Sequence, residues 1–564
     1  MVSQVEQSIF DCIDRVESFV LDAGAGSGKT WALVQALNYV IETKSKALIG
    51  KNQKIVCITY TNVAKDEIIE RTEHNDFISV STIHDFLWDS IKNYQKELKL
   101  KLLELIAEKT VKEEEKLSGY TAKAVKSREK SESRILKYNE AKEILESQNL
   151  KITYDNYSSY KKGKFSHDEL IIMAERIFAE YPKIRKIIAD SYPIIFVDEY
   201  QDTQKETVLI LLEHMHVKSN FMLGFFGDKR QQIYDSGIGE IPTSYELTLI
   251  QKKENFRSSA EVVGLLNKLR NDLVQEQPEH NKRRGKIVFY YTPGIEKFNA
   301  NEFIESNLKD LWGIKSATEV KVLYLIHRFI ARENKYEEIY AVHSKNTDVV
   351  IKNKDNRGLS PFTDILFDIE EICALYEENK TQALLKKIYF NIGSFSSKKE
   401  LNKLMGTLIE IRGKGKIGDV IEYVFENKLL SRSDAIKDYD FEDDGKKKFY
   451  DGIINIDYAQ FMRLYQVQQD NTPFSTKHNT KGDEFDNVLV VVDDDNKFYK
   501  YNFNEYFSGN EGKIERYNLT RNLFYVVCSR AMYNLAIVCV STLSDMAKSN
   551  IKEWFGGENY IEVG

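Results

Sequence analysis

The stretch DAGAGSGKTW, residues 22–31, decides the fold class of this 564-residue chain. It matches the pattern of a phosphate-binding loop, in which glycines let backbone N–H groups turn toward phosphate oxygens. A helix that starts near Lys29 adds the positive end of its dipole. In such a loop Lys29 reaches the β- and γ-phosphates, and the Thr30 hydroxyl is a ligand of Mg²⁺. The residues predicted to bind nucleotide here are Ala23, Gly24, Ala25, Gly26, Ser27, Gly28, Lys29 and Thr30.

Strand-like and helix-like segments alternate around this loop. Strands are predicted at residues 18–22, 54–60, 77–82, 192–198 and 220–228, with helices at 29–40 and 62–71. A second group of strands is predicted at 286–291, 320–325, 487–492 and 535–540. Such alternation indicates α/β domains, each built on a parallel sheet with helices on its faces.

Two long segments interrupt this pattern. Residues 91–190 are rich in Lys and Glu and lack proline until Pro182, and residues 345–470 also look mainly helical. We therefore predict two α/β domains, each split by a helical insertion. The first domain comprises 1–90 and 191–257 with insertion 91–190, and the second comprises 258–344 and 471–564 with insertion 345–470. The charged stretch FEDDGKKKF, 441–449, is predicted to be an exposed loop.

Composition restricts the protein class only loosely. The chain has 80 basic and 87 acidic residues, and its formal net charge of −7 neither indicates nor excludes nucleic-acid binding. Five scattered cysteines without C-x-x-C spacing favour reduced core thiols over a zinc or iron–sulfur site. The start lacks the apolar segment of a signal peptide, and no run approaches the roughly 18 apolar residues of a membrane span. A cytoplasmic protein is expected.

A second segment completes the predicted ATP site. In IIFVDEYQDT, residues 194–203, an apolar strand ends in two acids. Asp198 is predicted to hold Mg²⁺ and Glu199 to polarise the attacking water. A base beside the metal ligand favours hydrolysis over transfer to a hydroxyl group.

DEYQDT resembles motif II of the UvrD/Rep/PcrA helicases of superfamily 1. Seven further segments resemble family motifs in the family's order: 59–68, 81–86, 165–170, 227–234, 254–259, 475–491 and 522–531. Together with the phosphate-binding loop they extend over residues 23–531. The resemblance implies two RecA-like domains and an ATP-dependent DNA helicase or single-stranded DNA translocase that moves 3′ to 5′.

The resemblance also implies roles for residues around ATP. Gln231 would contact the γ-phosphate and the attacking water, and Arg257 and Arg530 resemble the family's arginine fingers. Gln7 would read the adenine edge. Gly482 and Glu484 would bind the nucleotide, Glu484 through the ribose hydroxyls.

Trp31 follows the loop where relatives often have arginine. The resemblance implies that Trp31 and Phe256 stack on the two faces of adenine. Ordinary helix packing under the loop is an equally open explanation for Trp31, because large aromatic side chains are usually at least partly buried.

For DNA, Tyr60, Asn62 and His84 match family positions that face the single strand, and His478 is a coupling candidate. A lone histidine is more often structural. The sequence departs from the family after Tyr234, where YDSGIG replaces YGWRGA, and Asp483 replaces an apolar residue. Gln251–Lys253 and Lys282–Lys286 are alternative sources of charge for the DNA.

The resemblance extends to compact UvrD-like helicases of anti-phage systems such as Gabija, which stand beside an OLD-family nuclease. A helicase of DNA repair or phage defence is therefore expected, with DNA and such a nuclease as partners. The alternative is a nucleotide- or DNA-sensing ATPase subunit that controls a partner nuclease without processive unwinding. A P-loop kinase or a transporter ATPase is disfavoured by Glu199 and the paired arginines.

Overall fold

The structure is a computed structural model. It describes all residues except 1, 60–61, 121–123, 156, 216–220, 234–236, 294–297, 326–329, 333, 347–359, 391–394, 469–473, 477–482, 495–500 and 564. The chain forms two compact units, Met1–Val320 with Gly482–Gly564, and Lys321–Lys481. The predicted division into four segments, with its boundaries, stays a prediction.

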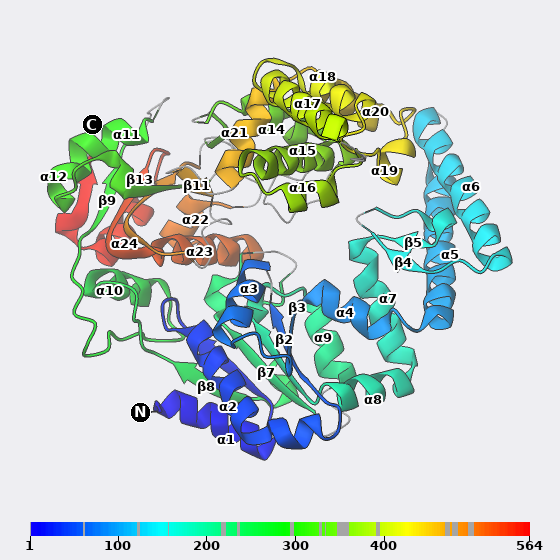
Figure 1. Cartoon of the computed structure of the whole chain (residues 1–564). Coiled ribbons are helices and arrows are strands. Elements are labelled where there is room, and N and C mark those ends of the chain that lie inside the picture. The colour runs from blue at the N-terminus through cyan, green and yellow to red at the C-terminus, as the bar shows by residue number, and fades with distance from the viewer. Residues whose placement is uncertain are drawn as a thin grey trace. The chain divides into compact units, whose positions relative to one another are not determined.

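The first unit contains a parallel six-stranded sheet (Figure 1). Its spatial order is β3 (Ile78–Thr82), β2 (Ile55–Thr59), β6 (Ile194–Asp198), β7 (Met222–Gly227), β1 (Phe19–Ala23) and β8 (Thr248–Lys252). Five of these strands were predicted, within one or two residues at each end in most cases. β8 was missed because three of the five residues of TLIQK are polar and the strand lies at the sheet edge, where only one side is covered.

Helices cover both faces of this sheet. Because successive side chains of a strand point to opposite faces, each strand has buried residues on both. Phe19, Leu21 and Phe196 point to one face, where helices α1 (Gln4–Arg15) and α2 (Lys29–Ile49) cover them. Val20 and Val197 point to the other face. That face is covered by α4 (Ile83–Ile91), α7 (His167–Glu180), α8 (Pro182–Ser191) and α9 (Lys205–Leu209).

The segment between β3 and β6 is mainly helical, as predicted. Its two long helices, α5 (Gln95–Gly119) and α6 (Val125–Ser147), pack against each other (Figure 1). A short parallel pair, β4 (Thr153–Tyr154) and β5 (Lys164–Phe165), follows them.

A second group of parallel strands belongs to the same unit. β12 (Phe485–Val492), β13 (Ala531–Cys539), β9 (Ile287–Tyr291) and β14 (Tyr560–Glu562) are neighbours in this order. Helix α23 (Ile514–Cys528) joins β12 to β13, as a parallel connection requires. Further helices here are α10 (Ala260–Leu269), α22 (Phe503–Ser508) and α24 (Asp545–Phe555). The predicted α/β class, with parallel sheets flanked by helices, is confirmed.

The second unit is almost entirely helical. It holds the parallel pair β10 (Val320–Tyr324) and β11 (Phe474–Thr476). Its longer helices are α14 (Glu337–Asn346), α15 (Pro361–Glu377), α17 (Phe395–Lys414), α18 (Ile417–Glu426), α20 (Asp444–Ile454) and α21 (Tyr458–Gln468). The prediction of a loop at 441–449 was wrong in its second half, because Asp443 caps α20 through its side chain and Phe449 is buried.

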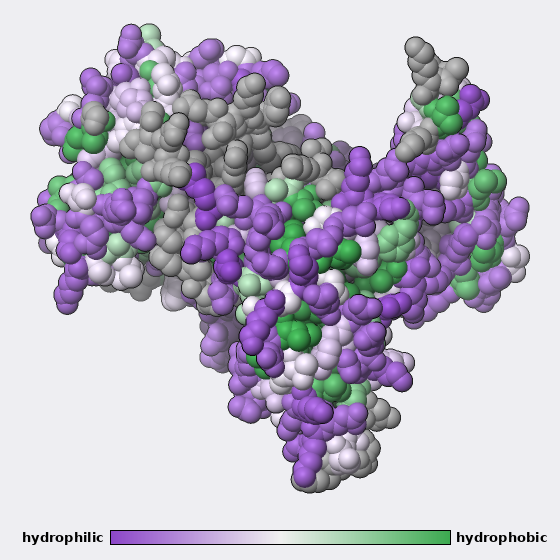
Figure 2. Space-filling view, turned by 90° about the horizontal axis from the view of Figure 1, so that it is seen from above, coloured by the Kyte–Doolittle hydropathy of each residue, from purple (hydrophilic) through white to green (hydrophobic). Residues whose placement is uncertain are grey.

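The surface carries mostly polar side chains. On the face that Figure 2 shows, hydrophilic residues dominate and apolar residues lie between them in small groups. Within the described part of the chain, no helix has the length and apolar character needed to cross a membrane. All five cysteines are buried and none forms a disulfide.

Candidate nucleotide-binding site

The phosphate-binding loop lies between β1 and α2 and depends on its glycines. Gly26 and Gly28 have φ values of 71° and 78°, a region that side chains other than glycine rarely adopt. A Cβ atom on Gly26 would also lie 2.7 Å from Cβ of Arg257. The loop therefore requires glycine at these two positions, and its second half lies close to the segment that carries Arg257.

The loop presents groups that suit a phosphate. The Ser27 hydroxyl is buried and has no hydrogen-bond partner among the described residues. Lys29 is 9% exposed, and its Nζ lies 3.7 Å from Oε2 of Glu199. A buried hydroxyl without a partner and a buried ammonium at a helix N-terminus fit the oxygens of a triphosphate.

The two acids of motif II differ in environment. Asp198 ends β6 and is buried. Glu199 has a φ of 49°, a left-handed conformation that costs a non-glycine residue about 1–3 kcal/mol and is found preferentially at functional sites. The backbone N–H of Glu199 donates to Oδ1 of Asp198, and Nε2 of Gln201 donates to Oε2 of Glu199. This conformation turns the Glu199 carboxylate toward Lys29.

Gln201 connects motif II with the segment 227–234, which resembles motif III of the family. Its Oε1 accepts a hydrogen bond of 3.1 Å from the backbone N–H of Asp228. The side chain of Gln231 in turn donates to Oδ2 of Asp228 over 3.1 Å. Both Gln231 and Asp228 are buried. The sequence analysis assigned no role to Gln201, although it belongs to the quoted DEYQDT segment.

The two predicted arginine fingers lie close to each other. Nε of Arg257 is 2.7 Å from Oε2 of Glu484, and its Nη1 donates to the carbonyl of Ser529 over 3.3 Å. The Arg530 side chain is buried and donates to the carbonyls of Val526 and Asp483. Glu484, predicted to bind the ribose, is here the ion-pair partner of Arg257.

The charge on Arg530 is poorly solvated. Burial, followed by the repulsion from Arg257, lowers the pKa of Arg530 to about 9, while Glu199 and Asp483 act in the opposite direction. A buried guanidinium beside a second arginine favours an additional anion nearby. The paired arginines and Lys29 therefore form a cationic site next to Glu199.

Two aromatic side chains flank the start of α2. A Cβ atom on Gly28 would lie 3.8 Å from Cβ of Trp31 and 3.9 Å from Cδ2 of Phe256. Trp31 is 56% exposed and Phe256 39%, so Trp31 is not a buried packing residue. The indole Nε1 of Trp31 donates to Oε1 of Glu6 over 3.1 Å. Stacking of both rings on adenine stays a prediction.

The remaining nucleotide candidates are placed only in part. Gln7 lies in α1, where its amide donates to Oδ1 of Asp11 over 2.8 Å. Thr30 lies in the first turn of α2. Gly482 lies outside the described residues.

Two of the four predicted DNA-contact residues, Asn62 and His84, lie in described elements. Tyr60 and His478 lie outside the described residues, and Asn62 begins α3 (Asn62–Arg71). The ring of His84 lies edge-on to His167, with centroids 5.0 Å apart. Burial, and to a smaller extent His167, lowers the pKa of His84 to about 4, so that it is neutral at pH 7.

Lys252, which was expected to supply positive charge for the DNA, does not face solvent. Lys252 is buried in β8, with its Nζ 3.4 Å from Oε2 of Glu254 and 5.3 Å from the ring centroid of Phe256. It is therefore part of the aromatic end of the nucleotide site, whereas Lys253 and Lys282 are exposed.

The chain is similar in sequence to several known proteins. Residues 14–243 match the model of the UvrD/REP helicase N-terminal domain. The chain is 28% identical, over 97% of its length and 96% of the relative, to the Gabija protein GajB of Bacillus cereus (strain HuB5-5). It is 23% identical to the ATP-dependent DNA helicase PcrA of Bacillus subtilis (strain 168), over 54% of this chain and 45% of PcrA. A probable DNA helicase II homolog of Mycoplasma capricolum is 24% identical over 56% of this chain and 47% of its own length. Residues 14–243 therefore match a UvrD/REP helicase N-terminal domain, and the chain is similar to ATP-dependent DNA helicases.

Proposed function

We propose that this protein hydrolyses ATP to move 3′ to 5′ along single-stranded DNA and to separate a duplex ahead of it. The observation that carries the proposal is the meeting of four groups. Lys29 and Glu199 follow strands β1 and β6 of the first sheet. Arg257 precedes α10, and Arg530 directly precedes β13 of the second group of strands. A nucleotide at this place would join the two parts of the unit, and its loss would release them.

The chemistry follows from the positions of these side chains. The loop N–H groups and Lys29 bind the β- and γ-phosphates, and Glu199 orients water and accepts its proton. Gln231 contacts the γ-phosphate and the attacking water, and Arg257 and Arg530 stabilise the charge on the departing phosphoryl group. Thr30 and Asp198 would hold Mg²⁺, which supplies charge neutralisation to the phosphate oxygens when it is bound.

Strand displacement and ATP hydrolysis test this proposal together. We expect ATPase activity that single-stranded DNA stimulates, and displacement from 3′-tailed but not 5′-tailed duplexes. Lys29→Ala and Glu199→Gln should abolish both activities. Arg15→Gln, whose side chain is 66% exposed, is the matched control and should leave both intact. Equal ATP hydrolysis with and without DNA, together with no displacement of any duplex, would refute the motor.

We further infer a role in anti-phage defence, in the cytoplasm and beside a partner nuclease. The similarity to a Gabija protein over nearly the whole chain supports this role better than a role in general repair. The expected result is protection of cells against phage by this gene together with its neighbouring nuclease gene. Protection should be lost with Lys29→Ala. Full protection by the Lys29→Ala pair would contradict the inference.

A second function is favoured by the departure after motif III, where YDSGIG lacks the tryptophan that relatives place on a DNA base. In this case the ATPase senses nucleotide or DNA and licenses the nuclease without processive unwinding. Co-purification with the nuclease and ATP-dependent control of cleavage, without displacement of tailed duplexes, would select this function over the motor.

A further inference from the structure

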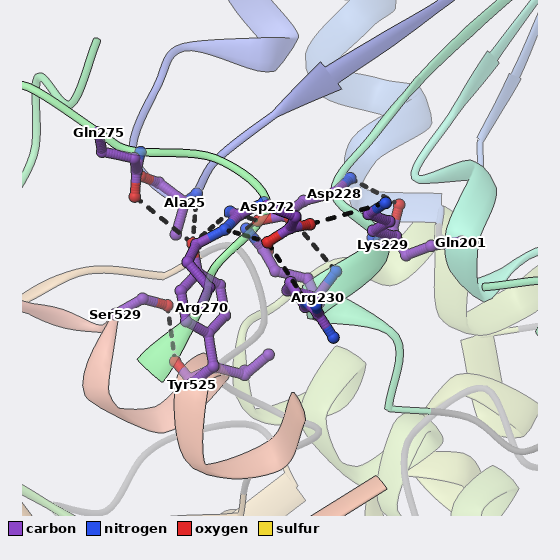
Figure 3. Close-up of polar contacts among 12 residues, drawn as sticks. Ala25, Gln201, Asp228, Lys229, Arg230, Arg270, Asp272, Gln275, Tyr525 and Ser529 are labelled. Atoms are coloured by element: carbon purple, nitrogen blue, oxygen red, sulfur yellow. Dashed lines mark hydrogen bonds and ion pairs between the residues drawn. The ribbon is translucent and has the colours of Figure 1, made fainter. Parts of the chain in front are cut away.

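A buried set of side chains, of which Arg270, Asp272 and Gln275 lie outside the recognised motifs, holds the phosphate-binding loop (Figure 3). The backbone N–H of Ala25 donates to the hydroxyl of Tyr525 over 3.3 Å. The carbonyl of Ala25 accepts from the amides of Asn255, at 3.0 Å, and Gln275, at 2.9 Å. A Cβ atom on Gly24 would lie 2.4 Å from the Gln275 amide carbon. The first half of the loop is thus fixed on three sides.

Arg270 joins this contact to the γ-phosphate side of the site. Its side chain is fully buried, and its Nη1 donates to the Tyr525 hydroxyl over 2.9 Å. The same nitrogen lies 3.4 Å from Oδ2 of Asp228, while Nε lies 3.1 Å from Oδ1 of Asp272. Only a planar guanidinium serves two carboxylates and a hydroxyl at once, which a lysine ammonium on a flexible stem does not reproduce.

The chain of contacts continues to the catalytic glutamate. Asp228 accepts from the side chain of Gln231 and donates its backbone N–H to Gln201, and Gln201 bonds to Glu199. A continuous path therefore runs from Ala25 through Tyr525 and Arg270 to both groups that act on the attacking water. Tyr525 lies on α23, the helix that ends just before Arg530.

We propose that Arg270 and Tyr525 are positioning residues that couple the placement of α23 to the phosphate-binding loop and to Gln231. They act through Ala25 and Asp228 rather than on the nucleotide. The consequence is that a shift of α23 disturbs phosphate binding and water activation together. This inference rests on the proposed ATPase function of the site.

A double-mutant cycle tests the coupling. Tyr525→Phe removes one hydroxyl and keeps the ring, and Arg270→Lys keeps the charge. Each variant should lower kcat/KM for ATP roughly tenfold or more, because each leaves buried polar groups unpaired. The kcat/KM of the double variant should be no more than about twofold below that of the less active single variant, because both changes break the same path of contacts. Arg15→Gln is the surface control.

Three readouts separate positioning from general support of the fold. Activity is expressed per folded molecule, melting temperature is measured for each variant, and binding of Mg²⁺ and a non-hydrolysable ATP analogue is followed by calorimetry. We expect the analogue to bind several-fold more weakly to both single variants and to the double variant alike. If Arg270→Lys does not fold, Gln275→Met replaces it in the cycle.

Two results would overturn the proposal. One is wild-type kcat/KM per folded molecule in the single variants, with only the melting temperature lowered. The other is a double variant whose loss equals the product of the two single losses. If the wild-type protein shows no DNA-stimulated ATP hydrolysis, the proposed function fails. The coupling of Arg270 and Tyr525 is then still tested by the affinities of the single and double variants for the ATP analogue, measured by calorimetry.

Discussion

Two acidic sites lie at the same carboxyl edge of the first sheet and differ in their access to water. Asp198 and Glu199 end β6, and the Glu199 side chain is 26% exposed and faces Lys29. Asp22 and Asp228 lie at the ends of β1 and β7, next to the fully buried Arg270. In the first site the Glu199 carboxylate is accessible to a substrate. In the second site the buried Arg270 compensates the charge of the acids within the protein. Chemistry and internal support are thus divided between neighbouring strands.

The buried site is not fully compensated. Oδ1 of Asp22 has no hydrogen-bond partner among the described residues. Burial, followed by the repulsion from Asp228, raises the pKa of Asp22 to about 6. Asp228 forms an ion pair with the guanidinium of Arg270. The charged form of Asp22 is therefore the one that burial destabilises in this site. The four predictions below test the contrast between the two sites.

The largest effect is expected at the open site. Glu199→Gln should lower kcat for ATP hydrolysis about 100- to 10,000-fold, because it removes the general base. Affinity for ATP should be retained, since Lys29 and the loop stay in place. Steady-state kinetics and calorimetry measure the two quantities. Glu206→Gln, on the exposed side of α9, is the control. If Glu199→Gln keeps the wild-type kcat, Glu199 is not the general base.

At the closed site, Asp228→Asn should affect stability. It leaves the Arg270 guanidinium buried with one counter-charge fewer, which costs about 3–5 kcal/mol of unfolding free energy when a buried pair is broken. Urea unfolding measures the change. Glu240→Gln, whose side chain is 65% exposed, should cost less than about 1 kcal/mol. A small effect at Asp228 would mean that Asp272 alone compensates Arg270.

Asp22→Asn should stabilise the protein at neutral pH. Because the pKa of Asp22 is raised from 3.8 to about 6, the folded state binds more protons than the unfolded state between these values. The wild type therefore loses stability as pH rises from about 4 to 6, by up to roughly 3 kcal/mol. The variant should match the wild type near pH 4 and exceed it above pH 6. Equal stabilisation at both pH values would show that ionisation is not the cause.

The smallest effect is expected at the rim of the closed site. Lys229 lies 2.7 Å from Glu240 and 3.7 Å from Asp272, with 26% of its side chain exposed. Lys229→Gln should change the unfolding free energy by less than about 1 kcal/mol, because partly exposed ion pairs contribute little. A loss above about 2 kcal/mol in urea unfolding would place Lys229 inside the buried network.

The open site was predictable from the sequence, and most of the closed site was not. Lys29, Asp198 and Glu199 lie in short segments whose spacing follows from strand, loop and helix geometry. Arg270 and Gln275 lie in no motif. Their links to Ala25, direct for Gln275 and through Tyr525 for Arg270, depend on the path of the chain after α10. A strand with few apolar residues, such as β8, lacks the apolar run that marks a buried strand in a sequence. The start of α20 did have a signal, since Asp443 is a typical N-cap residue.

The left-handed backbone of Glu199 has a consequence for laboratory evolution of this protein. Glycine adopts that conformation without strain, so replacement of Glu199 by glycine would relieve the backbone while removing the base. A selection for heat resistance alone would therefore favour the loss of Glu199, and a selection for turnover would restore it. Stability and activity thus make opposite demands at this one position, and a library screened for only one of them would lose the other.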